Sequence, residues 1–323
     1  MMRLGKLDND ELERLVLGKF PRTRPESLHG PRVGEDCAWL DLADDLAVFS
    51  CDPITSASAA HLGRLSVHVN CNDAAAAGAE PVGLLVTLLA PPTATPELIG
   101  QIADDLAAAA RLAGVDVIGG HTEVTDAVTR PVTSTAVVAR CPRQRRMRGM
   151  RPGDALVMTK WAALEGTAII AEDFPALAAR LTDRQLRAAR ALAELVSVVP
   201  EGRYAAAHGA AAMHDVTEGG VLGACWEMAQ LAGCGLVVDT ARIRVLPETR
   251  ALCAAAGLDP LRLIGSGSLL IACPDGEAMA AGLCAQGVEA AVIGHADADA
   301  GAVRTAEGEP IAPPGADELY RLF

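Results

Sequence analysis

Short apolar segments of strand length alternate with longer amphipathic segments along almost the whole chain of 323 residues. In the first half, strands are expected at 47–51, 82–90, 115–118 and 132–139. Helical patterns occupy 9–20, 62–77 and the segment from its Thr95 cap to Ala113. Because both kinds of element bury an apolar face, this alternation predicts a mixed α/β fold in which helices pack on a sheet.

Near the middle of the chain, the alternation is interrupted by an arginine-rich stretch from Arg140 to Arg151, which leads into the segment Arg151-Pro152-Gly153-Asp154. We therefore expect two domains, 1–148 and 149–323, which is also what the chain length favours. In the second domain we expect helices at 164–180, 183–195, 219–231, 248–256 and 277–286, a strand-like segment ending at Met213, and strands at 155–159, 236–238, 269–273 and 290–293.

Composition excludes several classes of protein. The net charge of −13 argues against a nucleic-acid-binding surface, which needs an excess of lysine and arginine. The apolar runs are interrupted before the roughly 18 residues of a membrane span, and the charged N-terminal segment does not resemble a signal peptide. The nine cysteines are scattered without a C-x-x-C pair, so we expect reduced thiols in a cytoplasmic protein.

Three acidic, glycine-adjacent loops stand out in the first half. They are Gly34-Glu35-Asp36-Cys37, Ser50-Cys51-Asp52-Pro53, and Asn70-Cys71-Asn72-Asp73 in the segment that runs on to Gly78. A carboxylate at the end of an apolar segment is costly unless it has a partner. Mg²⁺ prefers hard oxygen ligands and commonly bridges them to phosphates, so these loops suggest a magnesium–phosphate site.

A fourth candidate is Gly119-Gly120-His121-Thr122-Glu123, which follows a predicted strand. Paired glycines after a strand would form a loop whose backbone amides can approach a ligand. Neither G-x-x-x-x-G-K-[ST] nor G-x-G-x-x-G occurs, so a nucleotide site must be of another type.

In the second half, His214-Asp215-Val216-Thr217-Glu218-Gly219-Gly220 joins an apolar segment to a helix. Free amides at a helix N-terminus attract anions, and His214 and Asp215 could exchange protons near neutral pH. A capping turn with a structural histidine is the alternative. Lys160 is the only lysine of this half, and Ser266-Gly267-Ser268 forms a second tight loop.

Taken in order, these segments resemble the aminoimidazole-ribonucleotide (AIR) synthetase-like superfamily over nearly the whole chain. The most specific stretch is Asn72-Asp73-x-x-x-x-Gly78-Ala79-Glu80-Pro81, followed by a strand, a long helix and the double glycine. Within the superfamily the chain is most similar to the hydrogenase-maturation carbamoyl dehydratase branch, on its Gly34–Ala38 loop and its His214-Asp215 turn.

The resemblance implies an N-terminal domain that binds ATP·Mg²⁺ and whose sheet forms a dimer-interface barrel. It implies a C-terminal mixed sheet with helices packed on it, which carries the substrate and active-site residues. Homodimerisation, a small-molecule substrate and a maturation-type protein partner are expected. Metal ligands are expected at Asp36, Asp52, Asp73 and Glu123. ATP or phosphate contacts are expected at Gly34, Asn72, Gly119, Gly120, His121, Thr122, Thr217, Gly219 and Gly220. Catalytic roles are expected for His214, Asp215 and Lys160.

Two features depart from that branch. The branch carries its carbamoyl group on a C-terminal cysteine, whereas the last cysteine here is Cys284 and the printed sequence ends Leu-Tyr-Arg-Leu-Phe. His121 stands where an aspartate usually follows the glycines, so a metal ligand is lost or Glu123 replaces it. The leading expectation is an ATP-dependent enzyme that activates or phosphorylates an oxygen of a small molecule. The alternatives are an AIR synthetase-type enzyme of purine synthesis, although Leu164–Thr167 stands where its substrate-phosphate loop is expected, and a non-catalytic nucleotide-binding dimer that acts through a protein partner.

Overall fold

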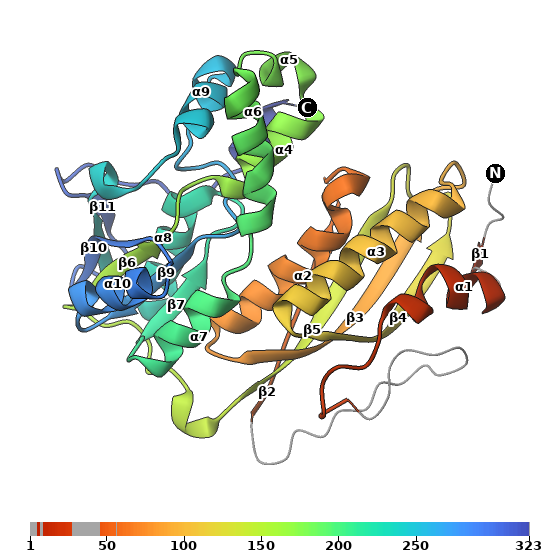
Figure 1. Cartoon of the computed structure of the whole chain (residues 1–323). Helices are drawn as coiled ribbons and strands as arrows, with labels where there is room; N and C mark the ends of the chain where they lie inside the picture. The colour runs from red at the N-terminus through yellow and green to blue at the C-terminus, as the bar shows by residue number, and fades with distance from the viewer. Residues whose placement is uncertain (1–4, 7–8, 28–45, 56, 323) are drawn as a thin grey trace. The chain divides into compact units, whose positions relative to one another are not determined.

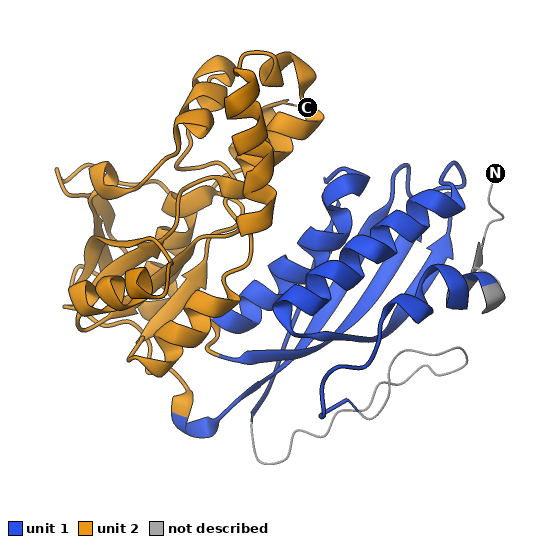
Figure 2. Cartoon of the chain, viewed as in Figure 1, with its two compact units in different colours: residues 1–75, 79–144 blue, residues 76–78, 145–323 orange. Residues whose placement is uncertain are grey.

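The computed structural model describes residues 5–6, 9–27, 46–55 and 57–322. It divides the chain into two compact units, residues 1–75 with 79–144 and residues 76–78 with 145–323 (Figure 2). The sequence-based boundary at 148/149 falls four residues after this division.

Unit 1 is a sheet with helices on one face (Figure 1). Its elements are β1 (Gly5–Lys6), α1 (Asn9–Leu15), β2 (Leu46–Ile54), α2 (Ala59–Ala76), β3 (Glu80–Ala90), α3 (Pro96–Ala113), β4 (Asp116–Val124) and β5 (Val132–Cys141). The described strands pair in the order β1-β4-β3-β5-β2, with β3 and β4 parallel and the other pairs antiparallel. The long helix α3 is the crossover between the two parallel strands, as parallel pairing requires.

Helix α3 begins and ends where the sequence predicts. The Thr95 side chain accepts a hydrogen bond from the Leu98 amide at 3.2 Å, Pro96 occupies the first turn, and Gly114 closes the helix in the left-handed conformation. Its buried face carries Ile99, Ile102 and other small or branched residues, so α3 packs closely on the sheet.

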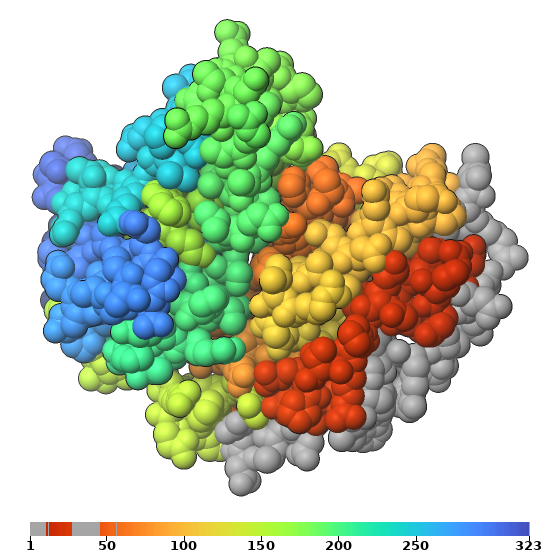
Figure 3. All heavy atoms as spheres, in the orientation of Figure 1, coloured from red at the N-terminus to blue at the C-terminus, as the bar shows by residue number. Residues whose placement is uncertain are grey.

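An ion-pair network joins the segment after α1 to the sheet of unit 1. The Asp116 carboxylate accepts backbone hydrogen bonds from Thr23 and Arg24 at 2.9–3.0 Å. Arg24 and Arg140 both pair with Glu80, and although burial raises the pKa of Glu80, the two guanidinium groups outweigh it and hold that pKa below its usual value. In Figure 3 this N-terminal segment, in red, lies against α3, in yellow.

Unit 2 is built on a second, mixed sheet. Its strands are β6 (Ala155–Thr159), β7 (Ala212–Asp215), β8 (Gly235–Val238), β9 (Leu269–Cys273), β10 (Ala290–Asp297) and β11 (Val303–Thr305), in the order β11-β8-β10-β6-β9-β7. Its helices are α4 (Leu164–Asp173), α5 (Pro175–Ala178), α6 (Asp183–Ala191), α7 (Val199–Ala207), α8 (Gly220–Ala232), α9 (Pro247–Ala256) and α10 (Gly276–Ala285). A short 3-10 segment, Glu318–Leu322, lies near the end.

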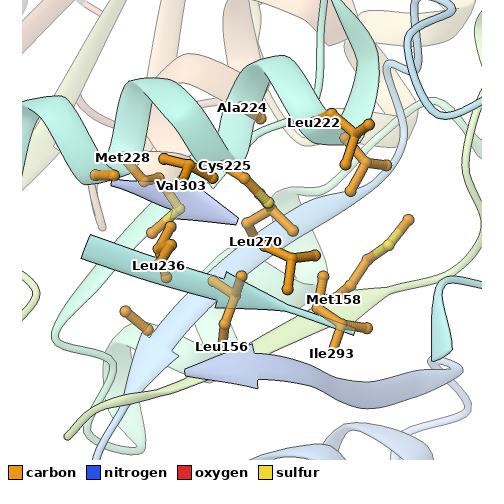
Figure 4. Packing of buried hydrophobic residues seen from close by; sticks show 14 of the residues in the cluster. Leu156, Met158, Leu222, Ala224, Cys225, Met228, Leu236, Leu270, Ile293 and Val303 are labelled. Atoms are coloured by element: carbon orange, nitrogen blue, oxygen red, sulfur yellow. The ribbon is translucent and has the colours of Figure 1, made fainter. Parts of the chain in front are cut away.

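Helices cover both faces of this sheet. Leu156 and Met158 of β6 pack in a buried cluster with Leu222, Cys225 and other residues of α8 (Figure 4). The residues that alternate with them in β6, Ala155 and Val157, face α10 instead. A Cβ added at Gly276 of α10 would lie 2.6 Å from the Ala155 side chain. Alternate strand residues thus face opposite helices, which explains why β9 is apolar throughout and β6 is apolar up to its last residue, Thr159. A further apolar cluster joins α4, α6, α9 and Leu319.

The structure corrects some predicted elements. The helix expected over 164–180 breaks after Asp173, because Pro175 lacks the amide needed to continue it. The strand-like segment expected before Met213 contains helix α7, whose first turn holds Pro200. The first helix ends at Leu15 and continues only as a 3-10 turn, Leu17–Lys19. The α/β class and two-sheet organisation are confirmed.

Candidate functional site

Asp52 and Asp73 lie on adjoining elements of unit 1, the edge strand β2 and the end of helix α2. The two segments were expected to be loops; instead, Asp52 is inside a strand and Asp73 inside a helix. The Ser50 hydroxyl donates to Asp73 Oδ2 at 2.5 Å, and Ser50 shares a face of β2 with Asp52. Asp52 and Asp73 are both partly buried.

Asn70 fastens this end of α2 to the strand. Its side-chain oxygen accepts the Asp52 amide hydrogen bond at 2.9 Å, and its amide group donates to the Ser66 carbonyl at 3.0 Å. Asn70 and Asp73 are three residues apart on the helix and therefore share its face toward β2. Asn70 is fully buried, and the sequence motif in which it stands does not by itself indicate this positioning role.

The remaining predicted ligands near this pair are placed differently. Gly34 and Asp36 lie outside the described residues. Asn72 is fully buried in unit 1, which places its side chain in the packing of α2. Across the described part of the chain, no group of three or more histidine, cysteine, aspartate or glutamate side chains is arranged to hold a metal ion.

The double glycine is not a loop. Strand β4 runs through Gly119, Gly120, His121, Thr122 and Glu123, and this corrects the expectation of a strand that ends at 118. Gly120 has φ of 147°, and a Cβ there would lie 1.8 Å from the Val86 carbonyl oxygen. The strand therefore needs glycine at 120 for close pairing with β3.

His121 and Glu123 form a pair, with His121 Nε2 and Glu123 Oε2 3.4 Å apart. The pairing register of the strands shows which face of the sheet His121 and Glu123 occupy. One row of cross-strand neighbours consists of Gly120, Val86, Thr135 and Asp52, and His121 belongs to the next row. Successive residues of a strand point to opposite faces, so within one chain Glu123 lies on the face opposite Asp52. The structure thus brings Asp52 and Asp73 together and keeps Glu123 apart from them.

In unit 2, the Thr217–Gly220 turn leads from β7 into helix α8. Gly220 has φ of 63°, and a Cβ there would lie 2.5 Å from the Leu261 carbonyl oxygen, so this close approach requires glycine. The Gly219 amide, expected to be open to a phosphate, donates to Asp317 Oδ2 at 2.7 Å. A carboxylate of the chain itself therefore occupies this anion-attracting position.

His214 lies next to this turn, at the end of edge strand β7. Its Nδ1 is 2.6 Å from the Asp215 carbonyl oxygen and its Nε2 is 3.3 Å from Glu227 Oε2. Burial alone would lower the pKa of His214, but these partners and the nearby Asp215 carboxylate outweigh it and raise the pKa above its usual value. Asp215 is buried beside it.

Lys160 is engaged in structural contacts. Its ammonium group donates to the carbonyls of Leu195 and Ser197 at 3.0 and 2.5 Å, and pairs with the buried Glu201 carboxylate at 2.7 Å. Three partners match the three hydrogens of an ammonium group. Burial lowers the pKa of Lys160, while Glu201 opposes that change. These contacts favour a structural role for Lys160, which connects the end of β6 to α7, over the expected catalytic role.

Glu165, at the start of α4, was not among the predicted site residues. Its side chain is 5% exposed, and burial raises its pKa to about 7 although hydrogen bonds from Ser266 oppose the increase. The negative charges of Asp317 and Glu218 raise the pKa further. A glutamate in a helical first turn normally indicates capping, so the sequence offers little signal of this burial.

None of the described helices combines the length and apolar character that crossing a membrane requires. The eight described cysteines are free thiols, as the scattered spacing predicts.

Comparison with known proteins assigns the class. Residues 34–141 match the family described as AIR synthase related protein, N-terminal domain, and residues 151–306 match AIR synthase related protein, C-terminal domain. Together these matches span most of the chain, and the chain belongs to the AIR synthase related family.

Within that family, the chain is similar to hydrogenase-maturation proteins. The carbamoyl dehydratase HypE of Rhodobacter capsulatus is 35% identical over 257 residues, which cover 75% of this chain and 72% of the relative. The crystal structure of Escherichia coli HypE superimposes with a TM-score of 0.81 at 25% identity, covering 97% of this chain and 99% of that one. A structure of HypE in complex with ATP has the same fold, with a TM-score of 0.77 at 22% identity over 97% and 96% of the two chains. The expected superfamily and branch are thus confirmed.

Proposed function

We propose that this chain is an ATP- and Mg²⁺-dependent enzyme that activates or phosphorylates an oxygen atom of a small molecule. The observation that carries the proposal is the Asp52–Asp73 pair on β2 and α2, in a chain whose relatives include a dehydratase and a protein crystallised with ATP.

The residues present suit a magnesium–nucleotide complex. Mg²⁺ is commonly bound through one or two carboxylates plus substrate phosphates, and it keeps several waters. Asp52 and Asp73 supply two carboxylates, and Asp36 is a further proposed ligand from the sequence. When bound, the ion neutralises phosphate charge during transfer. The chain contributes by fixing the Asp73 carboxylate through the Ser50 hydroxyl and the Asp52 backbone through Asn70.

We assign the acid–base role to His214. Its pairing with Glu227 favours the protonated imidazolium, which can hold a proton at Nε2 and release it to a group that replaces Glu227. Lys160 is omitted from this role because all its hydrogens have partners. The Thr217–Gly220 turn can receive an anion only if Asp317 leaves the Gly219 amide.

We also propose that the active form is a homodimer and that a maturation-type protein partner acts with it. The exposed face of sheet β1-β4-β3-β5-β2 supports a dimer, because Phe49 is 68% and Leu85 37% exposed there. Single exposed apolar residues are ordinary, but two on one sheet face favour an interface. A solved complex of HypE with HypF, whose fold this chain shares with a TM-score of 0.68, supports the partner.

Isothermal titration with ATP·Mg²⁺ tests the nucleotide site. The wild type should bind, and Asp73→Asn should weaken binding at least tenfold, because one negative ligand and the Ser50 hydrogen bond are altered. Asp126→Asn, an exposed aspartate of the same unit, is the matched control and should bind like the wild type. No binding by the wild type, or equal binding by both variants, contradicts the proposal.

A further inference from the structure

One oxygen of the buried Glu165 carboxyl group has no hydrogen-bond partner. Ser266 donates to this carboxyl group from its backbone and its side chain, yet Oε2 remains unsatisfied. An unsatisfied polar atom in a buried position costs free energy, so it calls for a physical explanation. This atom is independent of the helix N-terminus and of the nearby exposed acids, and in the ionised form of Glu165 it lacks a hydrogen-bond donor.

The groups around Glu165 do not supply that donor. The neighbouring carboxylates are Glu218 and Asp317, and both already have partners: the Tyr320 hydroxyl donates to Glu218 at 2.6 Å, and the Gly219 amide donates to Asp317. Three carboxyl groups therefore gather where α4 meets the turn before α8. Glu218 is exposed, so the cluster reaches solvent.

The cations recorded on adjoining segments are directed elsewhere. Arg262 donates to the carbonyls of Ala312 and Pro313, and Arg321 pairs with Glu318. Among the described residues, no positively charged side chain contributes to the pKa of Glu165 or of Asp317. An anionic ligand would be repelled here, and an apolar one would leave Oε2 unsatisfied.

We propose that Glu165 anchors a subsite of unit 2 for a cationic nitrogen group, an amine, amidine or guanidine, of the small molecule on which the enzyme acts. This assignment rests on the proposed function for its biological meaning, but the binding itself does not require ATP. The nitrogen donates an N–H to Glu165 Oε2, and its positive charge offsets the cluster formed with Glu218 and Asp317.

Protonation of Glu165 is linked to this binding. Because burial raises the pKa of Glu165 to about 7, much of the group is neutral at pH 7 in the free protein. A cation held by the carboxylate favours its ionised form and must lower its pKa. The subsite is therefore expected to bind cations more tightly at pH 8 than at pH 6.

A carbon-13 NMR titration of glutamate-labelled full-length protein tests this directly, with acetamidinium chloride as the probe. Acetamidinium should bind saturably and lower the apparent pKa of Glu165 by about one unit. Tetramethylammonium chloride at equal ionic strength, a cation without an N–H, should not. The carboxyl signal that disappears in Glu165→Gln identifies the Glu165 resonance. The affinity of that variant for acetamidinium should be at least tenfold lower than that of the wild type.

The control variant is Glu277→Gln, which changes the second residue of α10 as Glu165→Gln changes the second residue of α4. It should bind acetamidinium like the wild type. An equal response to both cations, no pKa change, or unchanged binding by Glu165→Gln overturns the subsite. Because ATP·Mg²⁺ titration of the same samples is a separate readout, loss of the nucleotide site and loss of this subsite are distinguishable.

Discussion

Both ring nitrogens of His214 face oxygen atoms, one from the backbone and one from Glu227. The raised pKa means that the folded protein holds this proton more tightly than the unfolded chain does. The pairing therefore stabilises the fold fully below the unfolded-state pKa of about 6.5, and its contribution is lost as pH rises through the higher folded-state value.

We expect His214→Gln to be less stable than the wild type by about 0.5–1 kcal/mol at pH 6, because the pair is partly exposed and screened. The difference should shrink by pH 9, where the wild-type imidazole is neutral. Urea unfolding at both pH values measures it. His295→Gln, on an exposed position of β10, is the control variant, and the same pattern in both variants would contradict the assignment.

At the residue scale, chemical type was easier to predict than environment. The sequence identifies Asp52, Asp73 and His214 as polar groups that interrupt apolar segments, and the structure gives each a defined partner. It cannot show that Lys160 is surrounded by carbonyls more than thirty residues away, or that Glu165 is buried, because both depend on contacts distant in sequence.

At the scale of elements, strand β4 carries the double glycine within its pairing to β3. If this segment were a flexible ligand loop, alanine would be tolerated equally at both glycines. In the observed strand, an added Cβ at Gly120 meets the Val86 backbone at 1.8 Å, whereas one at Gly119 meets only the Leu85 side chain at 3.2 Å.

Gly120→Ala should therefore destabilise the protein by about 3 kcal/mol or more, since backbone must move and φ is strained. Gly119→Ala, the matched neighbour, should cost less than about 1 kcal/mol because a leucine side chain can shift. Equilibrium unfolding monitored by circular dichroism compares the two, and similar losses would argue against the strand geometry.

Element prediction worked where local signals agreed with packing. The range 155–159 and the range 269–273 match β6 and β9, and the Thr95 cap, Pro96 and Gly114 mark α3. It was wrong at Gly119-Gly120, where glycines typical of turns serve close strand pairing instead. Whether these glycines lie in a strand or in a turn depends on pairing with the neighbouring strand, and sequence periodicity carries no information about that pairing.

At the scale of the whole molecule, the proposed homodimer uses the exposed face of the unit 1 sheet as its interface. Phe49→Glu should convert the dimer to a monomer, because it places a charge at the centre of an apolar contact. Leu112→Glu, at an equally exposed leucine at the end of α3, should leave the dimer intact. Analytical ultracentrifugation separates these outcomes, and a dimeric Phe49→Glu protein or a monomeric wild type would refute this interface.

The placement of β2 at the edge of its sheet also has a consequence for biosynthesis. Strand β2 pairs with β5, so Asp52 meets its partner Thr135 only after α2, β3, α3 and β4 have been made. The helix–strand contact that joins Asp52 to Asn70 can form earlier, while the sheet pairing must wait for the ribosome to release β5. The nascent chain therefore carries β2 as an unpaired strand for much of unit 1's synthesis, and its folding yield should depend on how quickly β5 follows.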